Sequence, residues 1–578
     1  MKKGLIFALL FVIGFALYAP NLQNKLFWDD EDWIINNPAV HGLSWQNVKF
    51  IFTNDTLAGI GLTSNYYRPF LFLTFLANYV MAGIRPLFYH LTSNAIHIAN
   101  AALIFYILDQ VIKKRRVAII ASLLFLIHPL QTEAVTYVSG RGDPLSVLFM
   151  LSALAAFLRG WKIMPYLFAI LAVLSRETAF LFPIYLTVFL VAFKHRESFF
   201  VSLKRSIRDA RFFYGISIFY GILRLTVLNF QNTLNFYRQS NIYTEHLAYR
   251  VFTFMHVLAV YFKLIFVPTG LHMERDVAIN TSFFQWPVWL GALIVLFILY
   301  LLRYFYKKDR FRVKASKEKI SNFRMWLFGW GWFFIGLAPT AGIFPINALI
   351  YEHWLYFSLF GFFTLVAYYG DILFQWLIDY VRPLGYVLGL LFIIFCVFLG
   401  VQTIRRNIIW GDLERFYNNV LYYEPRNVRV LNNLANYYSD NGRLGDAEKL
   451  LWKAVDADDL QPAPYYNLGN LLRDRKDYAG AAELYKKSII VDKHFLFSYT
   501  NLAAIYVQQG NLPGALEYLE QLKTIEPNNY GAYYNIGFVY NALGKKKDAL
   551  EALNIGLQLV KGNSGLESKF TEAINRLK

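Results

Sequence analysis

Four acidic residues stand in a row at positions 29–32, directly before Trp33 and shortly after the first long apolar run of the chain. A carboxylate in such a place can take a proton from an attacking hydroxyl group. Four together could also hold a divalent cation such as Mg²⁺ or Mn²⁺. The cluster could equally be an acidic N-terminal cap where the chain turns away from an apolar segment. We take Asp29 or Asp30 as the catalytic candidate, with a slight preference for Asp30, and leave the metal open.

Other ionisable residues recur at the ends of apolar runs that are far apart in the sequence. Ionisable groups at the depth of a membrane are functional candidates, although ion pairs and side chains that extend from loop ends into water account for part of any such set. The topology described below places all of them on one side, as expected around one shared site. The set comprises Arg68, His90, His128, Glu133, Arg141, Asp143, Arg176, Glu177, Arg275, Glu352 and His353.

The elements that position these residues are apolar runs confined to residues 1–403. The chain has 578 residues, 56% of them hydrophobic, and several runs are long enough to cross a hydrocarbon core of about 30 Å. Residues 1–403 carry 35 Lys and Arg against 19 Asp and Glu, and the remainder carries 22 against 20. A nucleic-acid-binding protein would need a basic soluble domain, so we exclude that class. The single cysteine, Cys396, excludes internal disulfides and a thiolate metal site.

The distribution of basic residues predicts eleven crossings. We expect a retained first span with its N-terminus in the cytoplasm, and a first outer loop over residues 21–86. Two amphipathic stretches of this loop, 45–53 and 69–82, are expected to lie on membrane lipids. Residues 246–268 are expected to re-enter the membrane with both ends outside. An odd number of crossings places the C-terminal domain outside as well.

A period of 34 residues follows a linker or capping helix at 404–424. It is marked by Asn433, Asn467, Asn501 and Asn535, and again by Ala447, Ala481, Ala515 and Ala549. This spacing is typical of the tetratricopeptide repeat, a pair of packed helices. We therefore expect four repeats and a C-terminal helix over residues 425–578. The fold class is all-α, a multi-spanning helical membrane domain (1–403) followed by an α-solenoid.

The recurring asparagines allow two interpretations. Repeats of this kind stack into a curved array whose concave face binds extended partners. A row of side-chain amides, each with a donor and an acceptor, could bind the main chain of a peptide. The same asparagines could instead bond one repeat to the next.

Several motifs jointly resemble the transmembrane-and-tetratricopeptide (TMTC) family, whose membrane domain is of the GT-C glycosyltransferase type. The segment 27–40 is similar to the family's first-loop acidic motif. Residues 67–69 with 88–90, 127–135 with 140–143, and 352–356 are similar to three further motifs in matching order. Two departures are His353, where the family usually has arginine, and Ser175-Arg176-Glu177, where it usually has a Lys-Glu pair.

The resemblance implies transfer of a sugar, mannose in that family, from a polyprenyl-phosphate donor to protein hydroxyl groups with inversion. Asp29 or Asp30 would then be the base. The leaving phosphate would need cations rather than an acid. The candidates are Arg68, Arg141 and Arg176, assisted by His128 and His353. The resemblance favours a site without metal, and Asn433, Asn467, Asn501 and Asn535 would bind the acceptor peptide.

Three other functions stay open. The sugar could go to a glycan or lipid while the repeats bind a partner enzyme. The chain could also be a non-enzymatic assembly platform. A transporter fits least, because its charges should lie near the midplane of the membrane and its halves should repeat. Without disulfides, a bacterial-type plasma membrane is the expected location.

Overall fold

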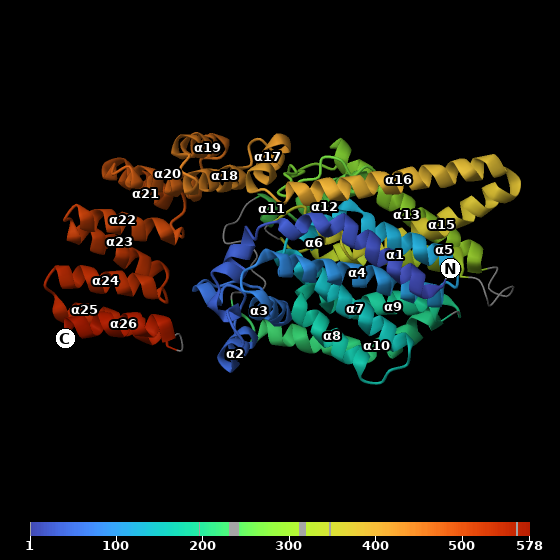
Figure 1. Cartoon of the computed structure of the whole chain (residues 1–578), viewed down its shortest axis with the longest axis horizontal. Helices are drawn as coiled ribbons and strands as arrows, with labels where there is room; N and C mark the ends of the chain where they lie inside the picture. Colours follow the sequence, from blue (N-terminus) through green and yellow to red (C-terminus); the bar gives the residue numbers. More distant parts are fainter. Residues whose placement is uncertain (1, 196, 231–241, 311–319, 346–347, 562–563) are drawn as a thin grey trace. The chain divides into compact units, whose positions relative to one another are not determined.

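The computed structural model describes residues 2–195, 197–230, 242–310, 320–345, 348–561 and 564–578, and it places no strand among them. The chain forms two compact units, Met1–Phe416 and Tyr417–Lys578. The division falls inside the predicted linker at 404–424. The all-α fold class is confirmed for the described residues (Figure 1).

The first unit is a bundle of helices joined by short irregular turns. Its helices are α1 (Lys3–Tyr18), α2 (Trp45–Thr53), α3 (Pro69–Ala82), α4 (Pro86–Val111), α5 (Arg115–Ile127), α6 (Thr132–Thr136), α7 (Gly142–Leu158), α8 (Met164–Ser175), α9 (Phe182–Phe193), α10 (Phe199–Leu225), α11 (Ile242–Glu245), α12 (Leu247–Phe266), α13 (Trp286–Arg310), α14 (Asn322–Leu337), α15 (Ser358–Tyr380) and α16 (Arg382–Ile409). Four short turns matter for the site: η2 (Glu31–Ile35), η6 (Ser139–Arg141), η7 (Glu177–Leu181) and η9 (Glu352–Leu355).

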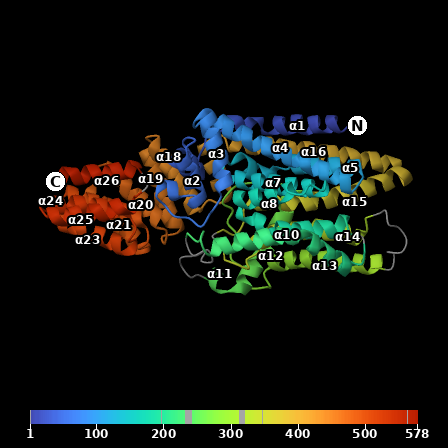
Figure 2. The same ribbon diagram turned by 90° about the horizontal axis from the view of Figure 1, so that it is seen from below.

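The bundle has two different ends. The starts of α1 and α5 and the turn between α15 and α16 lie at one end, and α2 and α3 lie at the other (Figure 1 and Figure 2). At the first end, ion pairs connect neighbouring helices, Lys3 to Asp109 at 2.9 Å and Arg116 to Asp371 at 3.0 Å. These basic residues are the ones that the sequence predicts in the cytoplasm. The predicted first outer loop therefore gathers at the opposite end.

Seven of the described helices are long and apolar enough to cross a membrane, or eight if the bent pair Arg115–Ile127 and Pro129–Thr136 counts as one span. The predicted crossings at α8, α9 and α14 are helices of 12, 12 and 16 residues. The count of eleven therefore stays a prediction. The multi-spanning character of the unit does not depend on it.

The predicted re-entrant segment, residues 246–268, corresponds to α12, which by length and composition could also be a span. The chain after it turns back along the helix. The Asn280 side-chain oxygen accepts a hydrogen bond from the His256 ring at 3.0 Å, and the Asn280 backbone N–H donates to the Thr253 hydroxyl at 2.9 Å. The next helix, α13, then starts beside the first half of α12, with Gly291 packed against Met255. Both helices thus begin at the same end of the bundle, which is the arrangement that re-entry requires.

The second unit contains four consecutive helix pairs and a final helix. The pairs are α18 (Val428–Asp440) with α19 (Leu444–Ala457), α20 (Pro462–Asp474) with α21 (Tyr478–Val491), α22 (Leu496–Gln508) with α23 (Leu512–Ile525), and α24 (Tyr530–Ala542) with α25 (Lys546–Leu559). Helix α17 (Leu413–Tyr423) precedes them, and α26 (Ser564–Leu577) follows them. The recurring alanines of the 34-residue period are fully buried, because only a small side chain lets paired helices approach closely. The predicted solenoid of four repeats is present.

Candidate active site

The first two residues of the acidic cluster, Asp29 and Asp30, differ in burial. Asp30 is 1% exposed. Its Oδ1 accepts hydrogen bonds from the backbone N–H and the hydroxyl of Ser139 at 2.7 and 2.5 Å. Its Oδ2 accepts from the backbone N–H of Phe27 at 3.4 Å. Burial raises the pKa of Asp30 to about 7, and the bonds from Ser139 and Phe27 offset part of that shift. Asp30 therefore attaches the first loop to the turn at Ser139.

Asp29 is half-buried and lies at the surface of this loop. Its backbone N–H donates to the hydroxyl of Tyr137 at 3.2 Å. Trp28, just before it, has φ 61°, a left-handed conformation that is costly for a bulky residue and is typical of functional sites. Of the two neighbouring carboxylates, Asp29 is the more exposed, and it interacts electrostatically with Tyr137.

Two arginines, Arg68 and Arg176, are each paired with a carboxylate. Arg68 donates from Nε to Glu177 at 2.9 Å, and Arg176 donates from Nε to Asp143 at 2.7 Å. Glu177 also accepts from the backbone N–H of Tyr67 at 2.9 Å. Within the described part of the chain, no acceptor bonds to the terminal nitrogens of either guanidinium. Each arginine is therefore oriented by a carboxylate and keeps its two-nitrogen edge available, which suits a phosphate oxygen pair.

The turn η6 and the start of α7 connect these groups. Ser139 holds Asp30, and Asp143, four residues later, holds Arg176. Residues four apart lie one above the other on a helical turn, about 5–6 Å apart. Gly142 lies between them, and a Cβ there would be 3.5 Å from the Ser175 carbonyl and 3.8 Å from an Arg176 terminal nitrogen. One turn of chain thus sets the separation between the acidic cluster and the arginine pair.

Arg141, on the same turn, is not the predicted phosphate ligand. Its guanidinium is fully buried and donates to Ser93, Thr74 and Asn78 and to the Tyr89 carbonyl at 2.8–3.0 Å. It also lies over the Phe75 ring at 5.0 Å. These neutral acceptors use four of its five N–H groups. Arg141 joins α3, α4 and α7, and its role is structural.

Two of the predicted histidines are also structural. His128 is 1% exposed; its Nε2 bonds to the Ile265 carbonyl at 3.0 Å and its Nδ1 accepts from the backbone N–H of Leu130 at 3.3 Å. Both ring nitrogens are thus occupied, so His128 cannot bind phosphate as predicted. His90 is buried and bonds to the Asn24 carbonyl at 3.1 Å.

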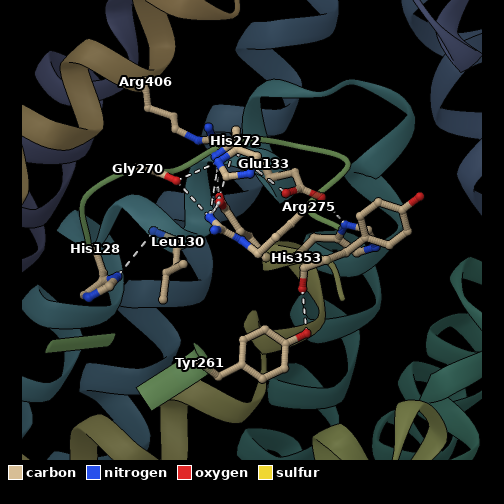
Figure 3. A network of polar contacts seen from close by, with 11 residues as sticks. His128, Leu130, Glu133, Tyr261, Gly270, His272, Arg275, His353 and Arg406 are labelled. Atoms are coloured by element: carbon tan, nitrogen blue, oxygen red, sulfur yellow. Dashed lines mark hydrogen bonds and ion pairs between the residues drawn. The ribbon is translucent and has the colours of Figure 1, made fainter. Parts of the chain in front are cut away.

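A network of charged side chains surrounds Glu133 and Glu352 (Figure 3). Asp143, the partner of Arg176, interacts electrostatically with His353 of this network. His353 bonds through Nδ1 to the buried Glu133 at 2.5 Å. Arg406 bonds to Glu352 at 2.7 Å and lies 3.9 Å from Glu133. Glu352 also accepts from the backbone N–H of His272 at 3.2 Å and lies 4.0 Å from Arg275. The network joins α6, η9, α16 and the segment after α12.

Four residues of the site were absent from the sequence-based set. Ser139 and Tyr137 bond to the two aspartates, Arg406 lies between two buried glutamates, and the backbone N–H of His272 donates to Glu352. The sequence could have indicated Arg406, because Arg405-Arg406 follows the last apolar run directly. The sequence offered no indication of Ser139 and Tyr137, because their roles depend on contacts with residues more than a hundred positions away.

The acidic cluster does not converge on a metal ion. Asp30 is directed at Ser139, whereas Glu31 and Asp32 are exposed. Among the described residues, no group of three or more His, Cys, Asp or Glu side chains is arranged to hold a metal. Binding of a divalent cation stays a prediction.

The predicted peptide-binding asparagines divide into two pairs. The side-chain N–H groups of Asn467 donate to Asn432 at 2.8 Å, and those of Asn501 donate to Asn470 at 2.9 Å. Both bonds connect one repeat to the preceding one. Asn433 and Asn535 are half-buried, and no such bond to a described residue is present for them. Binding of a peptide by all four remains a prediction, and two of the four have a structural role.

Comparisons with known proteins find relatives of this chain. Two family models of the tetratricopeptide repeat match residues 432–492 and 498–525. A protein O-mannosyl-transferase of Caenorhabditis elegans, F38B6.6, is 26% identical over 78% of this chain and 62% of its own length. This chain is a homologue of the TMTC proteins. Human protein O-mannosyl-transferase TMTC1 is 36% identical over 25% of the chain, which corresponds to 16% of the human protein.

The chain thus spans less than two thirds of the length of these curated TMTC relatives. Among solved structures, the MamA protein is 27% identical over 27% of the chain and 84% of its own length, with a TM-score of 0.24. The apolar helices and the TMTC homologues identify the chain as a multi-pass membrane protein.

Proposed function

We propose that this TMTC homologue is an integral-membrane glycosyltransferase that transfers mannose from a polyprenyl-phosphate donor to Ser or Thr hydroxyl groups of proteins, with inversion. The names of its relatives, protein O-mannosyl-transferases, support the reaction class. The tetratricopeptide repeats support a protein acceptor. A multi-pass membrane unit suits a donor carried on a lipid.

One observation carries the proposal: the short stretch 139–143 bonds Asp30 of the acidic cluster through Ser139 and Arg176 through Asp143. Inverting transfer needs a base for the acceptor hydroxyl on one side of the sugar and fixed positive charge for the leaving phosphate on the other. Asp29 is the accessible carboxylate. Arg68 and Arg176 keep their terminal nitrogens for the phosphate.

In the proposed step, Asp29 takes the proton of the acceptor hydroxyl group. The hydroxyl oxygen forms a bond to the anomeric carbon of the sugar at the same time. The bond from that carbon to the phosphate oxygen breaks, and its electron pair stays on the phosphate. Arg68 and Arg176 meet the new charge through bidentate contacts. Asp30 is a positioning residue, since its bonds to Ser139 fix the backbone from which Asp29 projects.

The location of the reaction follows from the same proposal. The site and the first loop lie at the end of the bundle opposite to the basic residues Lys3 and Arg116. Basic residues favour the cytoplasmic side. We place the site at the outer face of a bacterial-type plasma membrane, with the repeats on the same side, where they would deliver the acceptor.

The test is transfer by purified protein in lipid nanodiscs that contain radiolabelled polyprenyl-phosphate mannose and a Ser/Thr-rich peptide. We expect label on the peptide, and a loss of about 10²–10⁴-fold in Asp29→Asn. Donor binding should persist in that variant, because the arginine pair is intact. Asp379→Asn is the matched control, since Asp379 is exposed near the far end of α15.

Label on a glycan or lipid but not on any peptide would favour the alternative in which the acceptor is a glycan or lipid and the repeats bind a partner enzyme. Neither transfer nor donor hydrolysis, over a panel of donor sugars, would favour the non-enzymatic platform. Full activity of Asp29→Asn would remove the assigned base. Parallel reactions with EDTA test independently whether a divalent cation takes part.

A further inference from the structure

We infer that Trp410, directly after α16, is a positioning residue that fixes Asp29 for the transfer step. This inference rests on the proposed function and concerns its acceptor side. Trp410 is 1% exposed, and its ring contacts the two segments that hold the Asp29 backbone. The position of the proposed base therefore depends on one aromatic side chain that is far away in the sequence.

The first of these segments is the pair of aromatic residues that precede Asp29. The ring centroid of Phe27 lies 5.8 Å from that of Trp410. The Phe416 ring completes the group, with its centroid 4.8 Å from Trp410 and 5.1 Å from Phe27. It also lies 6.2 Å from the Trp28 ring. Aromatic rings at separations of about 4.5–7 Å attract one another beyond the effect of buried area, so the chain is held firmly up to Asp29.

The second segment contains Tyr137. Its hydroxyl accepts a hydrogen bond from the backbone N–H of Asp29 at 3.2 Å and interacts electrostatically with the Asp29 carboxylate. The Tyr137 ring lies 5.7 Å from that of Trp410, with the planes 38° apart. The indole thus contacts both the aromatic residue that precedes Asp29 and the one that bonds to it. Loss of the indole would loosen both contacts together.

The end of α16 is itself bonded to both segments, so the indole has a fixed base. The side-chain N–H of Asn407 donates to the Leu17 carbonyl at 3.0 Å. The Asn407 side-chain oxygen accepts from the hydroxyl of Thr136, the residue just before the tyrosine. Its backbone carbonyl accepts from the side chain of Asn24 at 3.1 Å. These bonds hold the backbone from which the indole projects.

The indole nitrogen of Trp410 shows that the ring acts through its size and its faces. Nε1–H is buried and has no acceptor among the described residues, which is unfavourable for stability. Phenylalanine would avoid that unfavourable burial. Its smaller ring is expected to lose at least one of the contacts to Phe27, Tyr137 and Phe416. The position therefore allows stability and positioning to be measured separately.

Trp410 also contacts the charge network of Figure 3. The guanidinium carbon of Arg406 lies 5.9 Å from the centroid of the indole, within the range of a cation–π interaction. Arg406 is held separately by its 2.7 Å ion pair to Glu352. The arginine pair of the donor side, Arg68 and Arg176, is held by other carboxylates. Removal of the indole should therefore affect the acceptor side and leave donor binding intact.

The proposed chemistry makes the position of Asp29 critical. A general base must reach the hydroxyl group at a hydrogen-bond distance of about 2.6–3.2 Å. Misplacement of a reacting group by about 1 Å can lower a rate about 10²-fold. Asp29 lies at the surface of a loop, so the contacts of Phe27 and Tyr137 with Trp410 are what limit such a movement.

Three variants separate positioning from folding. Trp410→Leu should lower the kcat for mannose transfer about 10–100-fold and leave the KM for the donor unchanged. Trp410→Phe keeps an aromatic ring, so it should lose less kcat and keep the melting temperature. Trp330→Leu in α14 is the matched control, because Trp330 is 7% exposed and its Nε1–H also lacks a described acceptor. This control should lose stability and keep the kcat of the folded protein.

Hydrogen–deuterium exchange in nanodiscs measures the same effect without any activity. The backbone N–H groups of residues 29–31 are bonded to Tyr137, Phe27 and Trp28 in turn. Trp410→Leu should speed exchange over residues 27–35, whereas Trp330→Leu should not. If Trp410→Leu does not fold, Trp410→Phe provides both measurements.

The inference is overturned if the folded Trp410 variants keep the unaltered kcat, or if exchange over residues 27–35 stays as it is in the unaltered protein. It is also overturned if the KM for the donor rises while the kcat is unchanged. Absence of transfer in the unaltered protein would count against the proposed function instead, and the exchange measurement would still test whether Trp410 holds Asp29.

Discussion

At the scale of single residues, adjacent side chains of the same type have different fates. Asp30 is buried against Ser139, and Asp29, one position earlier, stays accessible. Arg141 is buried among neutral acceptors, whereas Arg68 and Arg176 are held by carboxylates at one nitrogen only. The two aspartates have the same charge and residue type, and so do the three arginines. The direction of the side chain decided the role.

The burial of Asp30 predicts an unusual dependence of stability on pH. Its pKa is about 7 in the folded protein and 3.8 ordinarily, so the folded state binds the proton more tightly. Stability should be greatest below pH 4 for this group, fall as pH rises towards 7, and level off above it. The total is on the order of a few kcal/mol. Melting curves of the unaltered protein and of Asp30→Asn test this, since the variant should lose that decline; an identical decline in both would contradict it.

The structural role of Arg141 predicts a stability defect. Arg141→Lys cannot reproduce four hydrogen bonds to separate acceptors. We expect a loss of about 2–4 kcal/mol in the free energy of unfolding, measured by denaturation in detergent. Arg85→Lys, an exposed arginine before α4, should change little. A stable Arg141→Lys protein that fails to bind donor would restore the phosphate-binding interpretation.

At the scale of elements, the site is assembled by turns between helices rather than by the helices themselves. Turn η6 holds the acidic loop, the start of α7 holds Arg176 and turn η7 holds Arg68, while η9 supplies His353 and Glu352. The segment after α12 brings His272 and Arg275 to the same place. The packing of α12 on α13 therefore determines whether this segment reaches the network.

Gly291 provides a test of that packing. A Cβ at this position would lie 2.0 Å from the Met255 carbonyl oxygen, so α12 must move if a side chain is added. Gly291→Ala should lower stability by about 1–3 kcal/mol and reduce donor binding. Gly215→Ala in α10 is the matched control, because a Cβ there meets nothing within 4 Å and alanine favours the helix. Equal melting temperatures of the two variants would contradict the assigned contact.

At the scale of the whole molecule, a charged membrane unit and a nearly neutral repeat unit carry separate tasks. The asparagines of the repeats allow the tasks to be separated by mutation. Asn467 and Asn501 bond between repeats, whereas Asn433 and Asn535 make no such bond to described residues. The first pair should therefore contribute to stability and the second pair to binding.

Replacing Asn467 and Asn501 together by alanine should destabilise the repeat unit by about 1–3 kcal/mol. Replacing Asn433 and Asn535 should leave the unfolding transition unchanged and raise the KM for a peptide acceptor several-fold. Hydrolysis of the donor should be unaffected in both, since it requires the membrane unit alone. The measurements are thermal unfolding and transfer kinetics at varied peptide concentration. An unchanged KM in both double variants would assign the repeats to another partner.

The sequence by itself determined the elements of this protein and where its chemistry is concentrated. Apolar runs and the 34-residue period depend on local spacing, so they can be recognised in the sequence without knowledge of any tertiary contact. The recurring alanines are buried as expected. Their position at the ends of apolar runs also identified the acidic cluster and the candidates Arg68, Arg176 and His353. Only the tertiary structure decided which of these residues remain accessible. Asp30, Arg141 and His128 are occupied by partners more than forty positions away, and whether a polar side chain is satisfied by such a partner is a property of packing that local sequence does not encode.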